Sequence, residues 1–294
     1  MTGGHEQRVL SASRRTDIPA FYMDWFMERL RKKTFESVNP FNGRISVIPA
    51  TSETVHTVVF WSKNFGPFLS RGYGRRLIEQ GFNLFFNFTV NSEAPLLEPK
   101  VPPLKERLKQ LDALCDRFGP ECVTWRFDPV CWFVNGNDIV KDNLTGFERI
   151  AERAIKAGVR RCITSFMDTY PKIQKRIAQK GPPMADFAFI DPPMEKKIAV
   201  LSDMERILER SDMQLLTCCE EEILEAMPQG SRTRKASCIP NDLLMGLYGG
   251  CLSTKRDSGQ RIRNGCGCMV SVDVGSYRMH PCFHGCLFCY ANPA

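Results

Sequence analysis

The sequence lacks the features of a secreted or membrane-embedded protein. Its first residues, Met1–Gln7, are polar, nothing near the start resembles a signal peptide, and the first apolar run is too short to span a bilayer. We therefore expect a cytoplasmic protein with no membrane partner.

Several catalytic and binding motifs are also missing. The sequence has no nucleophile elbow, no phosphate-binding glycine loop and no HExxH motif, so it gives no support for the chemistries that depend on them. It has no run of Lys or Arg either, because the formal net charge of +7 is spread thinly over 294 residues. Such a distribution is typical of an ordinary solvated surface, and we do not expect nucleic acid as a partner.

Cysteine, by contrast, is abundant. Thirteen Cys in a chain without a secretion signal indicate metal binding or catalysis more than disulfides. Nine of them lie between Cys218 and Cys289. The other four lie in periodic apolar segments, where a free Cys behaves as a small hydrophobe, and we expect them in the core: Cys115, Cys122, Cys131 and Cys162.

Apolar, β-rich runs alternate with helical patterns along most of the chain. Six strands are predicted, at Arg8–Ser13, Val55–Trp61, Phe82–Val90, Cys122–Phe127, Val159–Phe166 and Met213–Thr217. Helices are predicted from Pro19 onward, from Leu104 to Phe118, at Phe147–Lys156 and near Lys196–Arg210. This alternation favours a parallel sheet, and six units predict an α/β fold that is a partial or complete TIM-like (β/α) barrel.

The composition changes after the last predicted strand. Residues 1–217 are expected to form the barrel, with a hairpin at Glu36–Ile48, turning at Asn42-Gly43, as an insertion. From Cys218 the pattern dissolves into Gly, Cys and turn residues. Residues 218–294 are therefore predicted to form an irregular, Cys-rich cap that carries metal sites and packs on the barrel mouth.

Three of the late cysteines form a CxxxCxxC motif, which we call the terminal triplet: Cys282, Cys286 and Cys289. Soft thiolates select iron–sulfur clusters, zinc or Cu(I). Structural zinc sites usually close a tetrahedron with four protein ligands, whereas a lone triplet leaves one iron of a four-iron cube without a protein ligand. The spacing thus points to a metal centre with an open coordination position.

The terminal triplet resembles the cluster-binding motif of the radical S-adenosylmethionine superfamily. Phe288 occupies the aromatic place that this motif has before its third cysteine. The resemblance implies a [4Fe–4S] cluster whose open iron binds S-adenosylmethionine, and an electron from the reduced cluster that breaks a carbon–sulfur bond of this cofactor. In most of the superfamily the motif follows the first strand, whereas here it comes last.

More of the chain resembles one bacterial family with this late placement, the domain-of-unknown-function family DUF1848. The resemblance is carried by residues 11–21, 60–64, 125–129 and 266–290. The family name implies no particular reaction.

Polar residues follow several of the predicted strands, where a β/α barrel gathers its functional groups. An Arg and a carboxylate together suit the methionine part of S-adenosylmethionine, because the guanidinium pairs with its carboxylate and an Asp with its ammonium group. Such pairs could equally be internal ion pairs that brace the barrel rim. The candidate cofactor-binding residues are Arg14, Arg15, Asp17, Lys63, Asn87, Arg126, Asp128, Ser165 and Phe288.

A second metal site is predicted from four further thiols, Cys218, Cys238, Cys266 and Cys268. They are enough to saturate an auxiliary [4Fe–4S] cluster, our first expectation, or a zinc ion, and free thiols are the third alternative. Cys219 could replace Cys218, and Cys251 could replace Cys238.

The sequence therefore predicts a radical S-adenosylmethionine enzyme. We expect an unknown small-molecule or peptide substrate and a reducing partner such as flavodoxin or ferredoxin. The reaction is either hydrogen abstraction or 3-amino-3-carboxypropyl transfer. A non-catalytic iron–sulfur or zinc protein for electron transfer or binding is the alternative, and radical modification or repair of nucleic acid is a third.

Overall fold

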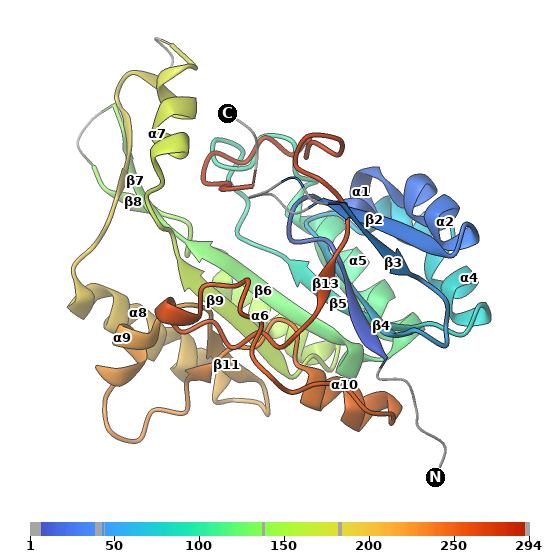
Figure 1. Ribbon diagram of the computed structural model, residues 1–294. Helices are drawn as coiled ribbons and strands as arrows, with labels where there is room; N and C mark the ends of the chain where they lie inside the picture. Colours follow the sequence, from blue (N-terminus) through green and yellow to red (C-terminus); the bar gives the residue numbers. More distant parts are fainter. Residues whose placement is uncertain (1–6, 39–42, 44, 137–138, 182–183, 292–294) are drawn as a thin grey trace.

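The computed structural model describes residues 7–38, 43, 45–136, 139–181 and 184–291. Its centre is an eight-stranded sheet with the order β12-β11-β9-β6-β5-β4-β1-β13, in which every neighbouring pair is parallel (Figure 1). The strands are β1 (Arg8–Ala12), β4 (Val55–Ser62), β5 (Asn83–Thr89), β6 (Val123–Val130), β9 (Arg161–Phe166), β11 (Gln214–Thr217), β12 (Arg234–Lys235) and β13 (Val272–Asp273).

The six central strands, β1 to β11, are the six strands predicted from the sequence, and they lie side by side in chain order. The α/β fold with a large parallel sheet is thereby confirmed. Among the described residues the sheet ends at β12 on one side and β13 on the other, and these two strands are not paired with each other. A closed barrel is therefore not confirmed.

Helices cover one face of this sheet (Figure 1). They are α1 (Ile18–Phe21), α2 (Met23–Arg31), α3 (Gly66–Ser70), α4 (Tyr73–Glu79), α5 (Leu104–Phe118), α6 (Phe147–Lys156), α8 (Met194–Leu208) and α9 (Glu221–Glu225), with a 3-10 turn at Pro120–Cys122. The bounds predicted for α5 and α6 are confirmed, and α8 begins and ends two residues earlier than predicted. The helix predicted at Pro19 is split, because α1 ends at Phe21 and α2 begins at Met23.

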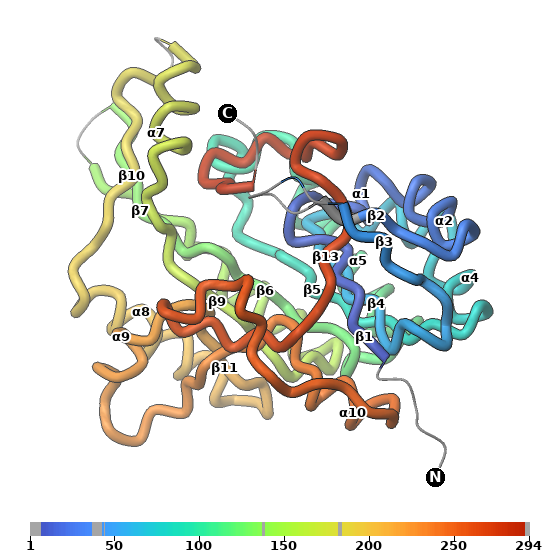
Figure 2. The backbone as a smooth tube through the Cα atoms, viewed as in Figure 1, coloured from blue at the N-terminus to red at the C-terminus, as the bar shows by residue number. Residues whose placement is uncertain are grey.

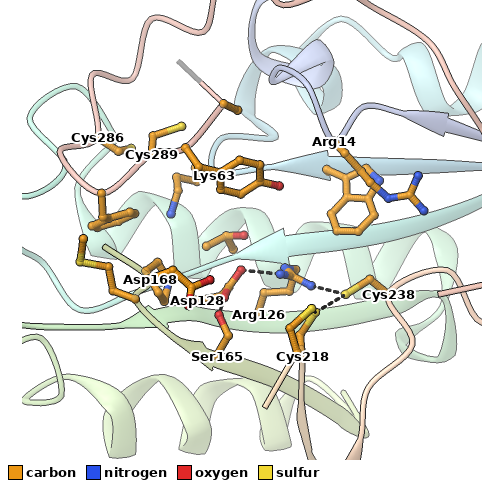
Figure 3. A pocket seen from close by; sticks show the side chains of 18 of the residues that line it. Arg14, Lys63, Arg126, Asp128, Ser165, Asp168, Cys218, Cys238, Cys286 and Cys289 are labelled. Carbon is orange, nitrogen blue, oxygen red and sulfur yellow. Dashed lines mark hydrogen bonds and ion pairs between the residues drawn. The ribbon is translucent and has the colours of Figure 1, made fainter. Parts of the chain in front are cut away.

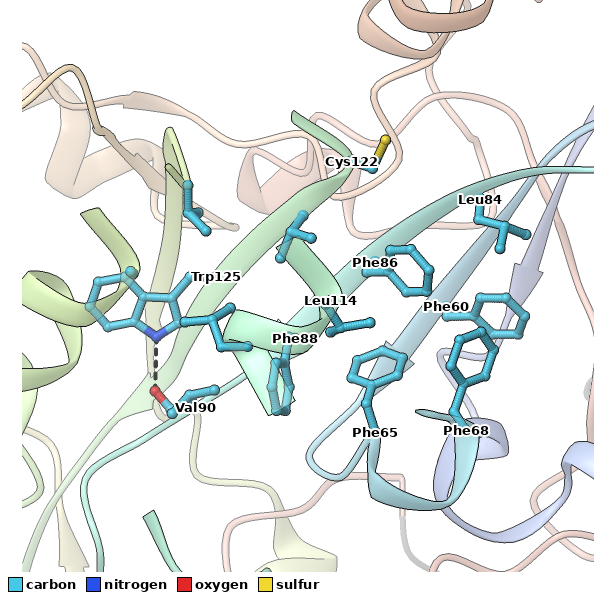
Figure 4. Close-up of a cluster of buried hydrophobic side chains, with 14 of the residues drawn as sticks. Phe60, Phe65, Phe68, Leu84, Phe86, Phe88, Val90, Leu114, Cys122 and Trp125 are labelled. Carbon is cyan, nitrogen blue, oxygen red and sulfur yellow. Dashed lines mark hydrogen bonds between the residues drawn. The ribbon is translucent and has the colours of Figure 1, made fainter. Parts of the chain in front are cut away.

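Alternate residues of each strand face opposite sides, which gives the sheet two different surfaces. Leu84, Phe86 and Phe88 of β5 join the large core beneath the helices (Figure 4). Phe85, between them, instead packs with residues of α10 (Asn241–Tyr248) on the other, inner face. The inner face is therefore covered by the C-terminal part of the chain.

Two antiparallel units are added to this frame. The predicted hairpin is present as β2 (Thr34–Val38) paired with β3 (Ile45–Pro49), although Asn42 of its predicted turn lies outside the described residues. A second sheet was not predicted and joins β7 (Trp132–Asn135) to β8 (Lys141–Asp142) and β10 (Phe187–Ile190). It lies beside α7 (Pro171–Ala178) and extends away from the main sheet (Figure 1).

The Cys-rich C-terminal segment crosses the inner face of the sheet (Figure 2). It is more regular than predicted, because it contains α9, β12, α10, a 3-10 turn at Ile262–Asn264 and β13. Strand β12 pairs with β11 and β13 pairs with β1, so the segment supplies both edges of the sheet. None of the described helices combines the length and apolar character that a membrane span requires.

Candidate metal and cofactor site

One cavity of about 270 Å³ lies where the central parallel strands end at their carboxyl termini. Eight cysteines line it, all from the C-terminal segment: Cys218, Cys219, Cys238, Cys266, Cys268, Cys282, Cys286 and Cys289. We call the first five the inner cysteine group. Labelled members of the terminal triplet and of the inner cysteine group lie on opposite sides of the cavity, with Arg126 and Asp128 between them (Figure 3). The fold thus brings both predicted metal-binding segments to one place.

Most of the candidate cofactor-binding residues predicted from the sequence also face this cavity. Those that line it are Arg14, Asp17, Lys63, Arg126, Asp128, Ser165 and Phe288. Arg15 and Asn87 do not. Arg15 donates to the backbone oxygen of Gly275 and pairs with Asp273, and the Asn87 amide donates to the backbone oxygen of Cys238. These two residues therefore hold loops of the C-terminal segment in place and do not face the cavity.

Arg126 and Asp128 form a buried ion pair at the end of β6. Burial by itself would lower the pKa of Arg126, but the charges of Asp128 and Cys238 raise it well above its usual value. Burial would likewise raise the pKa of Asp128, yet Arg126 and a hydrogen bond from Ser165 lower it. Both groups are therefore charged near neutral pH, and each already has a partner within the protein.

Arg126 also links this ion pair to the inner cysteine group. Its Nη1 atom donates to the Sγ atom of Cys238 at 2.6 Å (Figure 3). Arg126 and Arg14 each place a guanidinium over the ring of Trp61, at 5.2 and 5.7 Å from its centroid. Burial by itself would lower the pKa of Arg14, whereas Cys268 and nearby carboxylates raise it. Two cations thus face the thiols from the inner face of the sheet.

The loop of the terminal triplet is held in place by Asp17, which precedes α1. One oxygen of this carboxylate caps α1 by accepting from the backbone N–H of Ala20 and also accepts the Ser62 hydroxyl, at 3.0 and 2.7 Å. The other lies 2.7 Å from Nε2 of His284, a residue within the CxxxCxxC motif that is only 2% exposed. His284 therefore orients the triplet loop against the first βα unit, and its ring is engaged there.

The other side of the triplet loop is held by α7. Arg176 donates from Nη1 to the backbone oxygens of Cys286, Leu287 and Cys289, at 3.3, 3.3 and 2.9 Å. Burial raises the pKa of Cys282 to about 12 and that of Cys286 well above the usual value. A bound metal must therefore displace these protons, as metal binding to thiols generally does.

The thiols of the inner cysteine group contact one another. Sγ of Cys218 lies 3.7 Å from that of Cys219 and 3.9 Å from that of Cys238. Cys266 accepts hydrogen bonds from Cys218, Cys219 and Cys268, which lower its pKa. Cys251, the possible replacement for Cys238, is exposed and does not line the cavity. Within the described part of the chain, no three His, Cys, Asp or Glu side chains already surround a metal position.

Comparison with known protein families gives a match that covers most of the chain. A family model described as a domain of unknown function, DUF1848, matches residues 9–291. The chain belongs to the DUF1848 family. No curated protein matches it. The DUF1848 match includes both cysteine groups and every candidate residue lining the cavity, but the family description assigns no activity.

Some residues in or next to this cavity are not predicted from the sequence. Arg176 reaches the triplet loop from a helix more than 100 residues earlier, and nothing local distinguishes it from other surface arginines. Glu98 is buried and binds the Nζ atom of Lys63, which also lies 5.2 Å from the centroid of the Phe288 ring. Thr16 lines the cavity with a buried hydroxyl that has no partner among the described residues. Only the folded chain brings these groups together.

Proposed function

We propose that this DUF1848 protein is a radical S-adenosylmethionine enzyme in which the terminal triplet holds a [4Fe–4S] cluster. The observation that supports the proposal most strongly is that Cys282, Cys286 and Cys289 come from one loop and all line the cavity. In the described residues, no hydrogen-bonding contact joins any two of these thiols, or any of them to a fourth Cys. Three separated thiolates on one loop suit a four-iron cube that leaves one iron open to a ligand.

The donor set fits such a cluster. When bound, a [4Fe–4S] cluster supplies an open iron for S-adenosylmethionine and the electron for its reductive cleavage. Arg176 and His284 keep the loop in place from opposite sides, so the three sulfurs are held toward the cavity. Phe288 forms part of the cavity wall next to Lys63.

The cavity wall carries charges of both signs, which suits a zwitterionic cofactor. Lys63 and Arg14 supply positive charge, and Asp128 supplies negative charge. We infer that a carboxylate is attracted to the cations and an ammonium group to Asp128 or to hydroxyl groups such as that of Thr16. Because Arg126 and Asp128 already pair with each other, their main role is to hold the cavity wall in place, and the cofactor does not depend on both of them for binding.

The test is to reconstitute the protein anaerobically, reduce it with dithionite or with flavodoxin or ferredoxin, and add S-adenosylmethionine. We expect the cofactor to change the low-temperature EPR signal of the cluster and 5′-deoxyadenosine to form. Methylthioadenosine as the product would instead assign 3-amino-3-carboxypropyl chemistry within the same enzyme class.

The control is a matched pair of cysteine variants. The triple variant Cys282→Ala, Cys286→Ala and Cys289→Ala should lose cleavage, whereas Cys251→Ala, which changes an exposed thiol outside the cavity, should keep it. Full cleavage activity in the triple variant would contradict the proposal. Iron-loaded wild-type protein with no EPR change and no product would favour a non-catalytic role in electron transfer or binding.

A further inference from the structure

The inner cysteine group gathers its thiols in one buried cluster. Cys238, Cys266 and Cys268 belong to this cluster, and Cys218 and Cys219 pack against it. The Sγ atom of Cys218 lies 3.9 Å from that of Cys238. The fifth thiol, Cys219, follows Cys218 directly and lies 3.7 Å from it. Its backbone is in the left-handed region, with φ of 64°.

The spacing of the sulfurs distinguishes between kinds of metal centre. With a metal–sulfur distance of about 2.3 Å, tetrahedral geometry places two thiolates bound to one zinc-sized ion about 3.8 Å apart. Two of the inner thiols, those of Cys218 and Cys238, have their Sγ atoms 3.9 Å apart. In a four-iron cube each thiolate extends outward from a different iron, so its sulfurs lie much farther apart. The spacing of Cys218 and Cys238 therefore matches two ligands of a single ion.

The surroundings match the charge of such a centre. Four thiolates around a divalent ion carry a net negative charge, and Arg126 donates directly to one of these sulfurs. Arg14 lines the same cavity as these thiols. Hydrogen bonds and cations of this kind commonly support metal-bound sulfur. Side-chain rotation is still needed, because the thiols now contact each other and do not yet surround an ion position.

We propose that Cys218, Cys238, Cys266 and Cys268 bind one tetrahedral divalent metal ion of the zinc class, and that this site is closed and structural. It differs from the auxiliary four-iron cluster expected from the sequence. Four protein ligands leave no position for a substrate, so the ion acts by fastening three segments to each other: the end of β11, the loop after β12 and the turn before β13. Cys219 is not one of the ligands.

The site can be tested independently of the chemistry proposed for the terminal triplet. The full-length triple variant Cys282→Ala, Cys286→Ala and Cys289→Ala removes the triplet thiols, and cobalt(II) alone is then added as the probe. We expect one cobalt per chain with the intense visible bands of a tetrahedral tetrathiolate site, and one zinc per chain by elemental analysis when zinc is supplied. Wild-type protein, analysed in parallel for zinc, covers the case in which the triple variant does not fold.

Single changes in the same background identify the ligands. Cys266→Ser should shift the cobalt spectrum and lower the affinity for the ion at least tenfold, whereas Cys219→Ser and Cys251→Ser should keep one tightly bound ion. Four irons and four sulfides per chain in the triple variant would overturn the proposal, as would the absence of any bound metal. Loss of the ion in Cys219→Ser with retention in Cys218→Ser would overturn the ligand assignment.

Discussion

The terminal triplet and the inner cysteine group line the same cavity but are built in different ways. The triplet lies within eight consecutive residues, and its loop is fixed by side chains from outside it, Arg176 and Asp17. The inner cysteine group comes from segments as far apart as Cys218 and Cys268, and its side chains pack into one cluster. A short motif can therefore present separated sulfurs, whereas distant residues can be folded into close contact. Spacing along the sequence does not give spacing in the structure.

The largest effect on one cysteine group alone is expected from Gly267→Ala, in the turn that carries Cys266 and Cys268. A Cβ atom at Gly267 would lie 2.4 Å from the backbone oxygen of Ala236, so the Cys266–Cys268 turn would have to move. We expect a loss of about 2 kcal/mol in the free energy of unfolding, typical of overpacking, and loss of the inner metal with the triplet iron retained. Urea denaturation and elemental analysis measure both.

Gly246→Ala is the matched control for this change. Gly246 lies within α10 and has no atom within 4 Å of an added Cβ, so Ala should stabilise the helix by up to about 1 kcal/mol. Normal metal binding by Gly267→Ala would show that the turn is not held tightly against Ala236.

A smaller effect is expected from His284→Ala on the triplet side. The change removes one of two partners of a buried Asp17 oxygen, which keeps the backbone N–H of Lys63, and it should cost about 1 kcal/mol, the usual net value of one hydrogen bond. Iron retained by the triplet after desalting should fall, while the inner metal stays. His280→Ala is the control, because this ring packs on Trp25 and does not contact Asp17. Equal iron retention in both variants would argue against an orienting role for His284.

The smallest effect expected is a pH-dependent loss of stability at Glu205, which binds the residues just before β12 on the side of the inner cysteine group. Burial by itself would raise the pKa of Glu205, but hydrogen bonds from the backbone N–H of Arg232 and from Ser231 and Thr233 lower it. A lowered pKa stabilises the fold above the ordinary Glu value, and this contribution is lost as the pH falls through the folded-state pKa. Glu205→Gln should therefore be less stable than wild type near pH 7, with the difference shrinking toward pH 4 in thermal melts. A difference independent of pH would contradict the assignment.

The sequence predicted the repeating part of the fold and missed the parts that depend on long-range pairing. Strands such as β5 and helices such as α5 carry their own periodicity, and both were placed within about a residue. Strands β12 and β13 are two residues long and show no periodicity, so they form only because β11 and β1 offer free edges. The extra sheet of β7, β8 and β10 is missed for the same reason.

The candidate site shows the same division. The late cysteines and the polar residues after the strands could be selected from the sequence, since strand ends in a parallel sheet meet at one edge. Their partners could not. The contact between Arg126 and Cys238, and that between Asp17 and His284, join residues more than 100 positions apart. Pairing within the folded protein decides which charges remain available to a ligand.

The pairing of β1 with β13 has a consequence for the order in which the protein is completed. Leu10 lies opposite Val272 and Ser11 opposite Asp273, so β1 receives this neighbour only after more than 250 further residues have been synthesised. Contacts of such sequence separation slow folding, and until they form β1 presents an unpaired edge that can associate with other chains. During translation the nascent protein therefore holds an open sheet edge, and its cavity and both cysteine groups are completed only after the segment that carries β13 and the terminal triplet has been made.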